Sequence, residues 1–277
     1  MVMTSEADMQ NQTERVAWDH SSRDEFVAYY AGKSVQPSQL QHFRSVRNAI
    51  LRVLRKDNRS DKTYDVVDIG CNAGGQCFVW AEAGHRVHGL DVNGPLLELA
   101  RKRAVEAGQV IDYRLGSATQ LPWPDQSMDV CIATELLEHV SDWETCLSEF
   151  GRVLRRGGAL LLTTTNKMCP RQCEFNLPLY SWYPARAKHY FERLAVTTRP
   201  DLANNAIYPA VNWFTPYGLA QELAQRGFTS LDRFDIADTT IKSKLAILAI
   251  QSIRLLPPIR FLAHFCFAGT TTLAIKM

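Results

Sequence analysis

A glycine-rich turn early in the chain has the composition of a site for a nucleotide-like ligand. The stretch VVDIGCNAGGQ (66–76) begins with the apolar residues of a buried strand and ends in glycines. Gly70 and Gly74 would let the backbone turn tightly from strand to helix and approach a ligand closely. Asp91 follows Asp68 by 23 residues, at the end of the next apolar run, and an acid at that distance suits the hydroxyls of a ribose. The spacing predicts a site for an adenosine-containing ligand.

Asn72 stands where a second turn glycine is usual. A turn that binds a dinucleotide reads G-x-G-x-x-G and needs its second glycine for the approach of the pyrophosphate. From Gly70 this chain reads G-C-N-A-G-G, which argues against an NAD-dependent oxidoreductase. Asparagine adopts left-handed backbone angles more readily than other non-glycine residues. We therefore expect Asn72 to replace the middle glycine of the turn.

A second group of residues able to do chemistry lies in ATELLEHV (133–140), which contains Glu135, Glu138 and His139. An imidazole is suited to act as a general base near neutral pH. A structural alternative is that His139 orders the loop and packs under the ligand. In a third hypothesis, the two carboxylates and the imidazole hold Mg²⁺ against a pair of substrate oxygens. The sequence leaves all three open.

The elements that must position these residues alternate between strand and helix patterns. We expect strands at 64–69, 86–90, 110–114, 129–133, 159–164, 229–236 and 270–277. Helices are expected at 75–83, 95–106, 143–154 and 215–227. This alternation indicates an α/β fold with a mostly parallel sheet and helices on both faces, and the last strand is expected to be antiparallel.

Three segments fall outside the alternation. Residues 1–60 read as a tail, disordered over 1–20, and a helical cap broken near Pro37, before a domain spanning 61–277. An aromatic-rich insert at 166–212 could cap an apolar pocket or form a decoration with its own small core. A second, apolar insert at 241–266 is broken by a proline pair. It could be buried against the first insert as a lid, or it could lie in a membrane interface.

The composition limits the classes of partner. The 277 residues carry a net charge of +2, and 46% of them are apolar, so a full core is expected and a general polyanion-binding surface is not. The N-terminus has no apolar signal core, and no uninterrupted apolar run reaches the length of a membrane span. The seven cysteines are scattered, as is typical of reduced thiols. We expect a cytoplasmic protein without a nucleic-acid partner, with contact to a membrane surface left open.

The motifs together resemble those of a known family. The pattern Asp68, Gly70, Asn72, Gly74 resembles the D-x-G-x-G-x-G signature of class I S-adenosylmethionine-dependent methyltransferases. The stretches 114–140 and 147–166 resemble the regions that follow it in that family. The resemblance implies a Rossmann-like, seven-stranded sheet and S-adenosylmethionine as cofactor. The implied cofactor contacts are Asp68, Gly70, Cys71, Asn72, Gly74, Asp91, Val92, Ser117, Ala118 and Thr134.

Within the family, the chain resembles the small-molecule, ubiquinone-pathway O-methyltransferases most, through the Glu-x-x-Glu-His arrangement at 135–139. This implies O-methylation of a small hydrophobic acceptor, with Glu135, Glu138 and His139 as the catalytic candidates. The same arrangement is similar to the metal-binding cluster of small-RNA methyltransferases, which keeps the Mg²⁺ hypothesis open. The alternatives are an RNA or other N-methyltransferase and a catalytically silent, cofactor-binding partner subunit. The oligomeric state cannot be read from the sequence.

Overall fold

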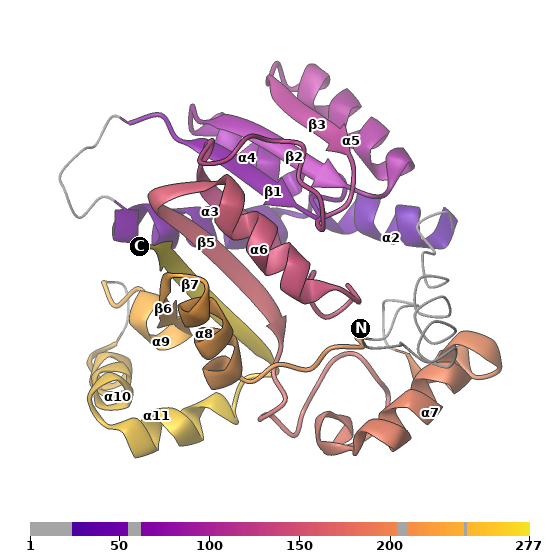
Figure 1. Cartoon of the computed structure of the whole chain (residues 1–277), viewed down its shortest axis with the longest axis vertical. Helices are drawn as coiled ribbons and strands as arrows, with labels where there is room; N and C mark the ends of the chain where they lie inside the picture. The colour runs from indigo at the N-terminus through magenta and orange to yellow at the C-terminus, as the bar shows by residue number, and fades with distance from the viewer. Residues whose placement is uncertain (1–23, 55–61, 204–209, 241–242) are drawn as a thin grey trace, which may run out of the picture.

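Seven strands form one sheet in the part of the chain that the computed structural model describes, which is residues 24–54, 62–203, 210–240 and 243–277 (Figure 1). In their spatial order, the strands are β3 (Ile111–Leu115), β2 (Arg86–Asp91), β1 (Asp65–Ile69), β4 (Met128–Thr134), β5 (Leu154–Thr165), β7 (Gly269–Lys276) and β6 (Phe228–Asp232). The first five are parallel, whereas β7 is antiparallel to both β5 and β6. The predicted sheet, including its antiparallel last strand, is confirmed.

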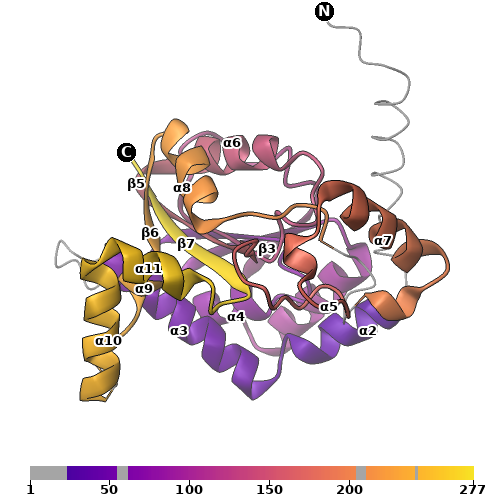
Figure 2. The same ribbon diagram turned by 90° about the horizontal axis from the view of Figure 1, so that it is seen from below.

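Helices cover both faces of the sheet, because the strand residues are apolar on both sides. Val67 packs into a core with α6 (Trp143–Val153) and α8 (Pro216–Gln225). Its neighbour Val66 points the other way, into a core with α3 (Pro37–Leu54), α4 (Gly75–Glu82) and α5 (Gly94–Glu106). Figure 2 shows α6 and α8 on one side of the sheet and α3, α4 and α5 on the other. Apolar runs without strict alternation are expected for such doubly covered strands.

The prediction of a strand at 229–236 is wrong for its second half. The strand β6 ends at Asp232, and residues 233–236 form the short helix α9 (Arg233–Ile236). A capping box causes the change of direction: the Asp232 carboxylate accepts the N–H of Phe234 (2.8 Å), and the Asp235 carboxylate accepts the N–H of Asp232 (3.0 Å). These bonds satisfy the first N–H groups of the helix.

The N-terminal helical pair lies against the glycine turn. Helix α2 (Asp24–Lys33) and α3 are separated by the break expected near Pro37. Arg103 on α5 donates to Ser34 Oγ and to the Ala31 carbonyl (both 2.9 Å). A Cβ on Gly75 would lie 2.3 Å from the Ser34 carbonyl oxygen, so only glycine allows this contact. The division into a cap and a main domain stays a prediction, and the disorder expected for 1–20 lies outside the described residues.

The first insert has a small core of its own. After β5 the chain forms the 3₁₀ turns η2 (Tyr180–Trp182) and η3 (Pro200–Leu202), with α7 (Ala185–Thr197) between them. Phe175 and Tyr180 stack with ring centroids 4.1 Å apart, and Ala195 and Leu202 complete the cluster. The insert therefore has the small core of its own that was one of the two predicted alternatives. That it caps an apolar pocket stays a prediction.

The second insert forms two exposed helices. Helix α10 (Lys244–Leu255) and α11 (Pro257–His264) meet at 109°, and none of the residues of α10, all of them described, is buried. The expected burial of this segment against the first insert is wrong for α10, because α10 packs on α9 and α11, at the opposite end of the molecule from α7 (Figure 2). Among the described residues, no single helix is long and apolar enough to cross a membrane; the bent pair passes by length and composition alone.

Candidate cofactor and acceptor site

The backbone of the glycine turn enters the left-handed region at three positions. Gly70, Asn72 and Gly74 have φ angles of 76°, 48° and 79°. The Asn72 side chain also donates Nδ2–H to the Gly70 carbonyl oxygen (3.1 Å). The expectation that Asn72 replaces a turn glycine is confirmed, because it has the conformation that the two glycines have beside it.

Substitution of Asn72 tests this conformation. We expect Asn72→Ala to lower the free energy of unfolding by about 1–2 kcal/mol, because alanine is strained at positive φ and loses the bond to Gly70. Asn72→Gly loses the same bond but adopts this conformation freely, so its loss should be smaller than that of the alanine variant by about 1 kcal/mol. Urea unfolding of the three proteins measures the difference. Equal destabilisation by both variants would contradict the conformational argument.

Asp91 joins three segments at the end of β2. Its Oδ2 accepts the N–H of Asn72 (2.7 Å) and its Oδ1 accepts the N–H of Asn93 (2.8 Å). Its backbone carbonyl accepts the N–H of Gly116 (3.0 Å), which brings the segment after β3 alongside. The residue is 7% exposed. An ionised carboxylate has about four acceptor positions, so it can serve the turn and a pair of ligand hydroxyls together.

The residues expected to face adenine lie beside the end of β2. Ala118 is buried, whereas Ser117 is exposed and its Oγ lies 2.7 Å from Thr119 Oγ1. Val92 is exposed, and Thr134 at the end of β4 is partly exposed. The parallel strands bring these positions to one edge of the sheet, as expected for ligand contacts. Contact of each side chain with a cofactor stays a prediction.

Asp68 lies beneath the turn. Its side chain is 3% exposed, and its Oδ2 lies 3.5 Å from Cys77 Sγ, a potential donor. Burial raises the pKa of Asp68 to about 7; the Cys77 thiol opposes this rise and the Asp91 charge adds to it. Cys71 is also buried, and its thiol lies near the Cβ position of Gly89. Asp68 is therefore a buried carboxyl beside the turn, and its charged form is disfavoured unless a cationic group lies near it.

Gln76 was missed by the sequence analysis. It is the second residue of α4, it is 3% exposed, and neither Oε1 nor Nε2 has a hydrogen-bond partner within the described part of the chain. An unpaired buried amide is unfavourable, so this side chain indicates a polar ligand near the start of α4. No signal marked it, because glutamine is an ordinary residue in the first turn of a helix.

The loop after β4 is fixed above the glycine turn. The N–H of Glu135 donates to the Thr163 carbonyl (2.8 Å), and Glu135 has a φ of 50°. A Cβ on Gly70 would lie 3.2 Å from Leu136 Cδ1, so the leucine packs directly on the turn. Asn212 holds the loop from the other side by donating Nδ2–H to the carbonyls of Leu137 (2.8 Å) and Val140 (2.7 Å). The last residue of the insert thus orders the loop that carries the catalytic candidates.

The three catalytic candidates differ in their exposure to solvent. Glu135 and His139 are exposed, whereas Glu138 is fully buried and its Oε2 accepts Thr164 Oγ1–H (2.8 Å). Burial, with the charge of Glu135, raises the pKa of Glu138 well above its ordinary value. Among the described residues, no group of three His, Cys, Asp or Glu side chains is arranged to hold a metal ion. The Mg²⁺ hypothesis at Glu135, Glu138 and His139 is therefore not supported.

Glu174, in the first insert, is a further residue that the sequence analysis missed. Burial raises its pKa to about 7, the charge of Glu135 adds to the rise, and Lys33 opposes it. Gln172 fixes the backbone here, because its Oε1 accepts the N–H groups of Glu174 (2.6 Å) and Phe175 (2.7 Å). The end of α2, the loop after β4 and the first insert therefore come within electrostatic range of one another. These segments are far apart in the sequence and are brought together by the tertiary fold, so no local sequence pattern reveals their proximity.

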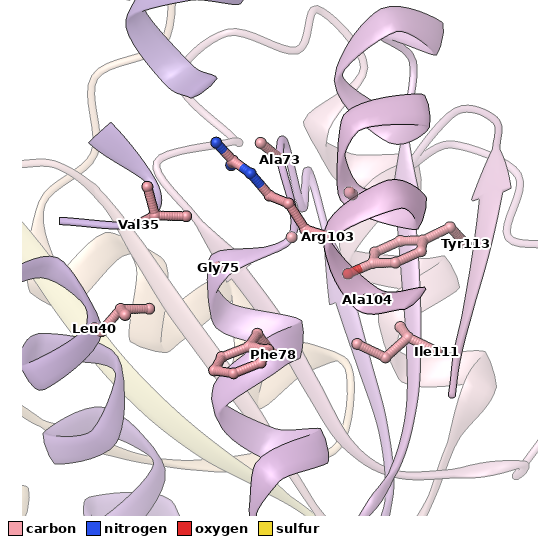
Figure 3. Close-up of a pocket in the computed structure, with 11 residues that line it drawn as sticks. Val35, Leu40, Ala73, Gly75, Phe78, Arg103, Ala104, Ile111 and Tyr113 are labelled. Atoms are coloured by element: carbon pink, nitrogen blue, oxygen red, sulfur yellow. The ribbon is translucent and has the colours of Figure 1, made fainter. Parts of the chain in front are cut away.

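A cavity of about 260 Å³ lies beside the turn and is almost entirely apolar (Figure 3). Val35 lines it from the turn between α2 and α3, Leu40 lines it from α3, and Phe78 lines it from α4. Of the predicted cofactor residues, Gly74 contributes to its wall, whereas Asp68 and Asp91 do not. The cavity is therefore separate from the predicted ribose site.

Comparisons with known proteins agree with this geometry. The methyltransferase domain family matches residues 67–162. The ubiquinone biosynthesis O-methyltransferase of Chelativorans sp. (strain BNC1) is 30% identical over 174 residues, which cover 60% of this chain and 66% of that protein. The malonyl-[acyl-carrier protein] O-methyltransferase of Yersinia pestis is 39% identical over 101 residues, 36% of each chain. The matched segments thus span less than two thirds of these relatives' own lengths.

The solved structures agree on the fold. The S-adenosylmethionine-dependent methyltransferase from Mesorhizobium loti superposes with a TM-score of 0.52 at 18% identity, over 82% of this chain and 98% of that one. Together, the sheet order, the glycine turn and the family match show that the chain belongs to the class I S-adenosylmethionine-dependent methyltransferases. Its relatives in sequence include O-methyltransferases of ubiquinone biosynthesis.

Proposed function

We propose that this protein transfers a methyl group from S-adenosylmethionine to an oxygen of a small, fairly apolar acceptor. The observation that carries the proposal is the junction at Asp91. There, the buried side-chain carboxylate of Asp91 accepts the N–H of Asn72 in the turn. The backbone carbonyl of Asp91 accepts the N–H of Gly116, in the segment after β3. A ligand with a ribose between an amino-acid group and an adenine fits this junction.

The cofactor would lie across the ends of β1, β2 and β3. Asp91 would accept the ribose hydroxyls, with Val92 beside it, and Ser117 and Ala118 would border the adenine. The turn would hold the amino-acid end of the cofactor, with Cys71 and Asn72 lining it and Thr134 close to the transferable methyl group. The buried Asp68 carboxyl, whose charged form a cation would stabilise, and the unpaired Gln76 amide support a polar, cationic group at this end.

The acceptor would lie under the loop after β4. When bound, S-adenosylmethionine supplies an electrophilic methyl group, so the residues of this chain need to align a hydroxyl and take its proton. His139 is the exposed candidate for the proton acceptor, and Glu135, on the same loop, is exposed as well. Glu138 is buried and bonded to Thr164, which suits a positioning role.

The first insert supports an apolar acceptor. Its Leu179 and Trp182 side chains remain about half exposed although the insert has its own core. Glu174, near the start of this insert, lies close enough to Glu135 for the charge of Glu135 to raise its pKa. The relative from Chelativorans is named for ubiquinone biosynthesis and the one from Yersinia pestis for malonyl-acyl-carrier protein. The proposal of an apolar hydroxyl acceptor therefore rests on the exposed side chains and on the first of these names.

Turnover of labelled S-adenosylmethionine tests the function. We expect methyl transfer to catechols with alkyl tails, with KM falling as the tail lengthens, and no transfer to RNA. Product analysis would show the methyl group on oxygen. Transfer to a nitrogen, or binding of S-adenosylhomocysteine without turnover of any phenol, catechol or sugar, would replace the proposal with an N-methyltransferase or a silent partner subunit.

The buried Asp68 carboxyl predicts a pH dependence of stability. Its pKa is raised from 3.8 to about 7, so between these values the native state binds a proton that the unfolded state releases. The stability that this group contributes is therefore present at low pH and is lost as the pH rises toward 7. We expect Asp68→Asn to flatten this fall in urea unfolding measured from pH 4.5 to 8. An unchanged slope would show that Asp68 is ionised throughout.

A further inference from the structure

The outer face of α10 and α11 is apolar and open to solvent. Six residues of these helices and their junction are between 41% and 81% exposed: Leu245, Leu248, Leu255, Leu256, Ile259 and Leu262. Their spacing places Leu245, Leu248 and Leu255 on one stripe of α10, at i, i+3 and i+10, and Ile259 and Leu262 on one stripe of α11, at i and i+3. A surface of this kind on a soluble protein indicates an interaction site.

Three polar side chains of the same helices, those of Arg254, Arg260 and His264, point inward. Arg254 donates to the carbonyls of Phe234 (2.8 Å) and Asp235 (3.1 Å). Arg260 donates to the Asp232 carboxylate (2.8 Å) and also bonds Asp235. His264 lies 3.0 Å from the same Asp232 carboxylate. These polar side chains therefore hold the helices on β6 and α9, and the apolar side chains face solvent. An ordinary surface helix has the opposite arrangement.

The charge and shape of this outer face favour a lipid surface. Residues 239–277 contain no Asp or Glu, so the segment itself brings no carboxylate toward an anionic headgroup. Lys244 is exposed at the start of α10. The two helices meet at 109° and project from the body (Figure 2), a convex shape that a bilayer accommodates. At the margin, the Tyr217 ring stacks on Phe261 with centroids 6.0 Å apart, as amphipathic rings do at headgroup level.

We propose that the outer face of α10 and α11 inserts into the interface of an anionic lipid bilayer, parallel to its surface. The docked face would be joined to the site by Asn166, at the end of β5. Its Nδ2–H groups donate to the carbonyls of His264 (2.8 Å) and Phe267 (2.7 Å). The inference goes beyond methyl transfer, because docking does not depend on the acceptor.

Vesicle flotation tests the docking. The full chain should float with vesicles of phosphatidylglycerol and phosphatidylcholine and less with phosphatidylcholine alone. The double variant Leu248→Glu, Leu262→Glu should bind at least about tenfold more weakly, because two charges would enter the apolar layer. The matched control is Val110→Glu, which places the same charge at a side chain 94% exposed on the opposite half of the molecule. It should bind like the parent protein.

Three measurements keep the result interpretable. Thermal unfolding shows that the double variant is folded, which is expected because both replaced side chains are exposed. Turnover without vesicles should be equal in parent and double variant, which separates failed docking from failed methyl transfer. Light scattering after gel filtration gives the mass. Absence of parent binding to anionic vesicles, or a dimer that the double variant dissociates without any vesicle binding, overturns the proposal.

Discussion

Replacement of Asp91 by alanine is expected to weaken binding of S-adenosylhomocysteine by about 100-fold, equivalent to about 2.7 kcal/mol. The variant would lack the carboxylate that is expected to bond the ribose hydroxyls. The turn would also be less ordered, because the two carboxylate oxygens accept the N–H groups of Asn72 and Asn93. Isothermal calorimetry with the purified protein measures the change. Asp91→Asn keeps one carbonyl oxygen and should lose less.

The control for Asp91→Ala is Asp112→Ala. Asp112 lies on β3, where its carboxylate bonds Arg114 and His88 outside the predicted site. Its removal should leave the binding constant unchanged. Should Asp91→Ala bind as tightly as the parent protein, or should neither bind, the predicted cofactor site would be wrong. Thermal unfolding without ligand separates a loss of contacts from a loss of the fold.

Replacement of His139 by alanine is expected to lower kcat by about 100- to 1000-fold, the usual contribution of a positioned general base. Cofactor affinity should be unchanged, because His139 is exposed on the loop above the turn. Added imidazole should restore part of the rate. His189→Ala is the matched control, since His189 lies on α7 and pairs with Glu192 within the insert. It should leave kcat unaltered.

Glu138→Gln distinguishes a positioning role from a catalytic one. The raised pKa favours the protonated, neutral form of Glu138, and glutamine has the charge of that form and can still accept from Thr164. We expect kcat to stay within about threefold of the parent value, because the charge state is the same. A loss as large as that of His139→Ala in a stably folded Glu138→Gln protein would make Glu138 the proton acceptor and remove that role from His139.

Local patterns were sufficient for the fold and the turn. The apolar strands, the helix periodicity and the glycine spacing each depend on residues close in sequence, and so does the left-handed conformation of Asn72. The break near Pro37 and the capped start of α8 at Thr215 are local for the same reason. The capping box that ends β6 was also readable, but the apolar run across it hid the change from strand to helix.

Tertiary contacts decided the features that were not predicted. Glu174 approaches Glu135 because the insert folds back over the loop after β4. The unpaired state of Gln76 depends on which groups surround the start of α4. The lid expectation failed for α10 for the same reason, because Arg254 on α10 and Arg260 on the adjoining α11 find their partners on α9 and β6. Their charges were visible in the sequence, but the direction in which they point was not.

The position of β7 also sets an order of assembly. Its partner β5 ends more than a hundred residues earlier, where Thr165 pairs with Gly269, and bringing such distant strands together costs chain entropy. Among the described strands, β6 pairs with β7 alone, so it cannot join the sheet before this long-range closure. An intermediate with β1 to β5 paired would leave the backbone of β5 open along one side, where a strand from another molecule could pair with it.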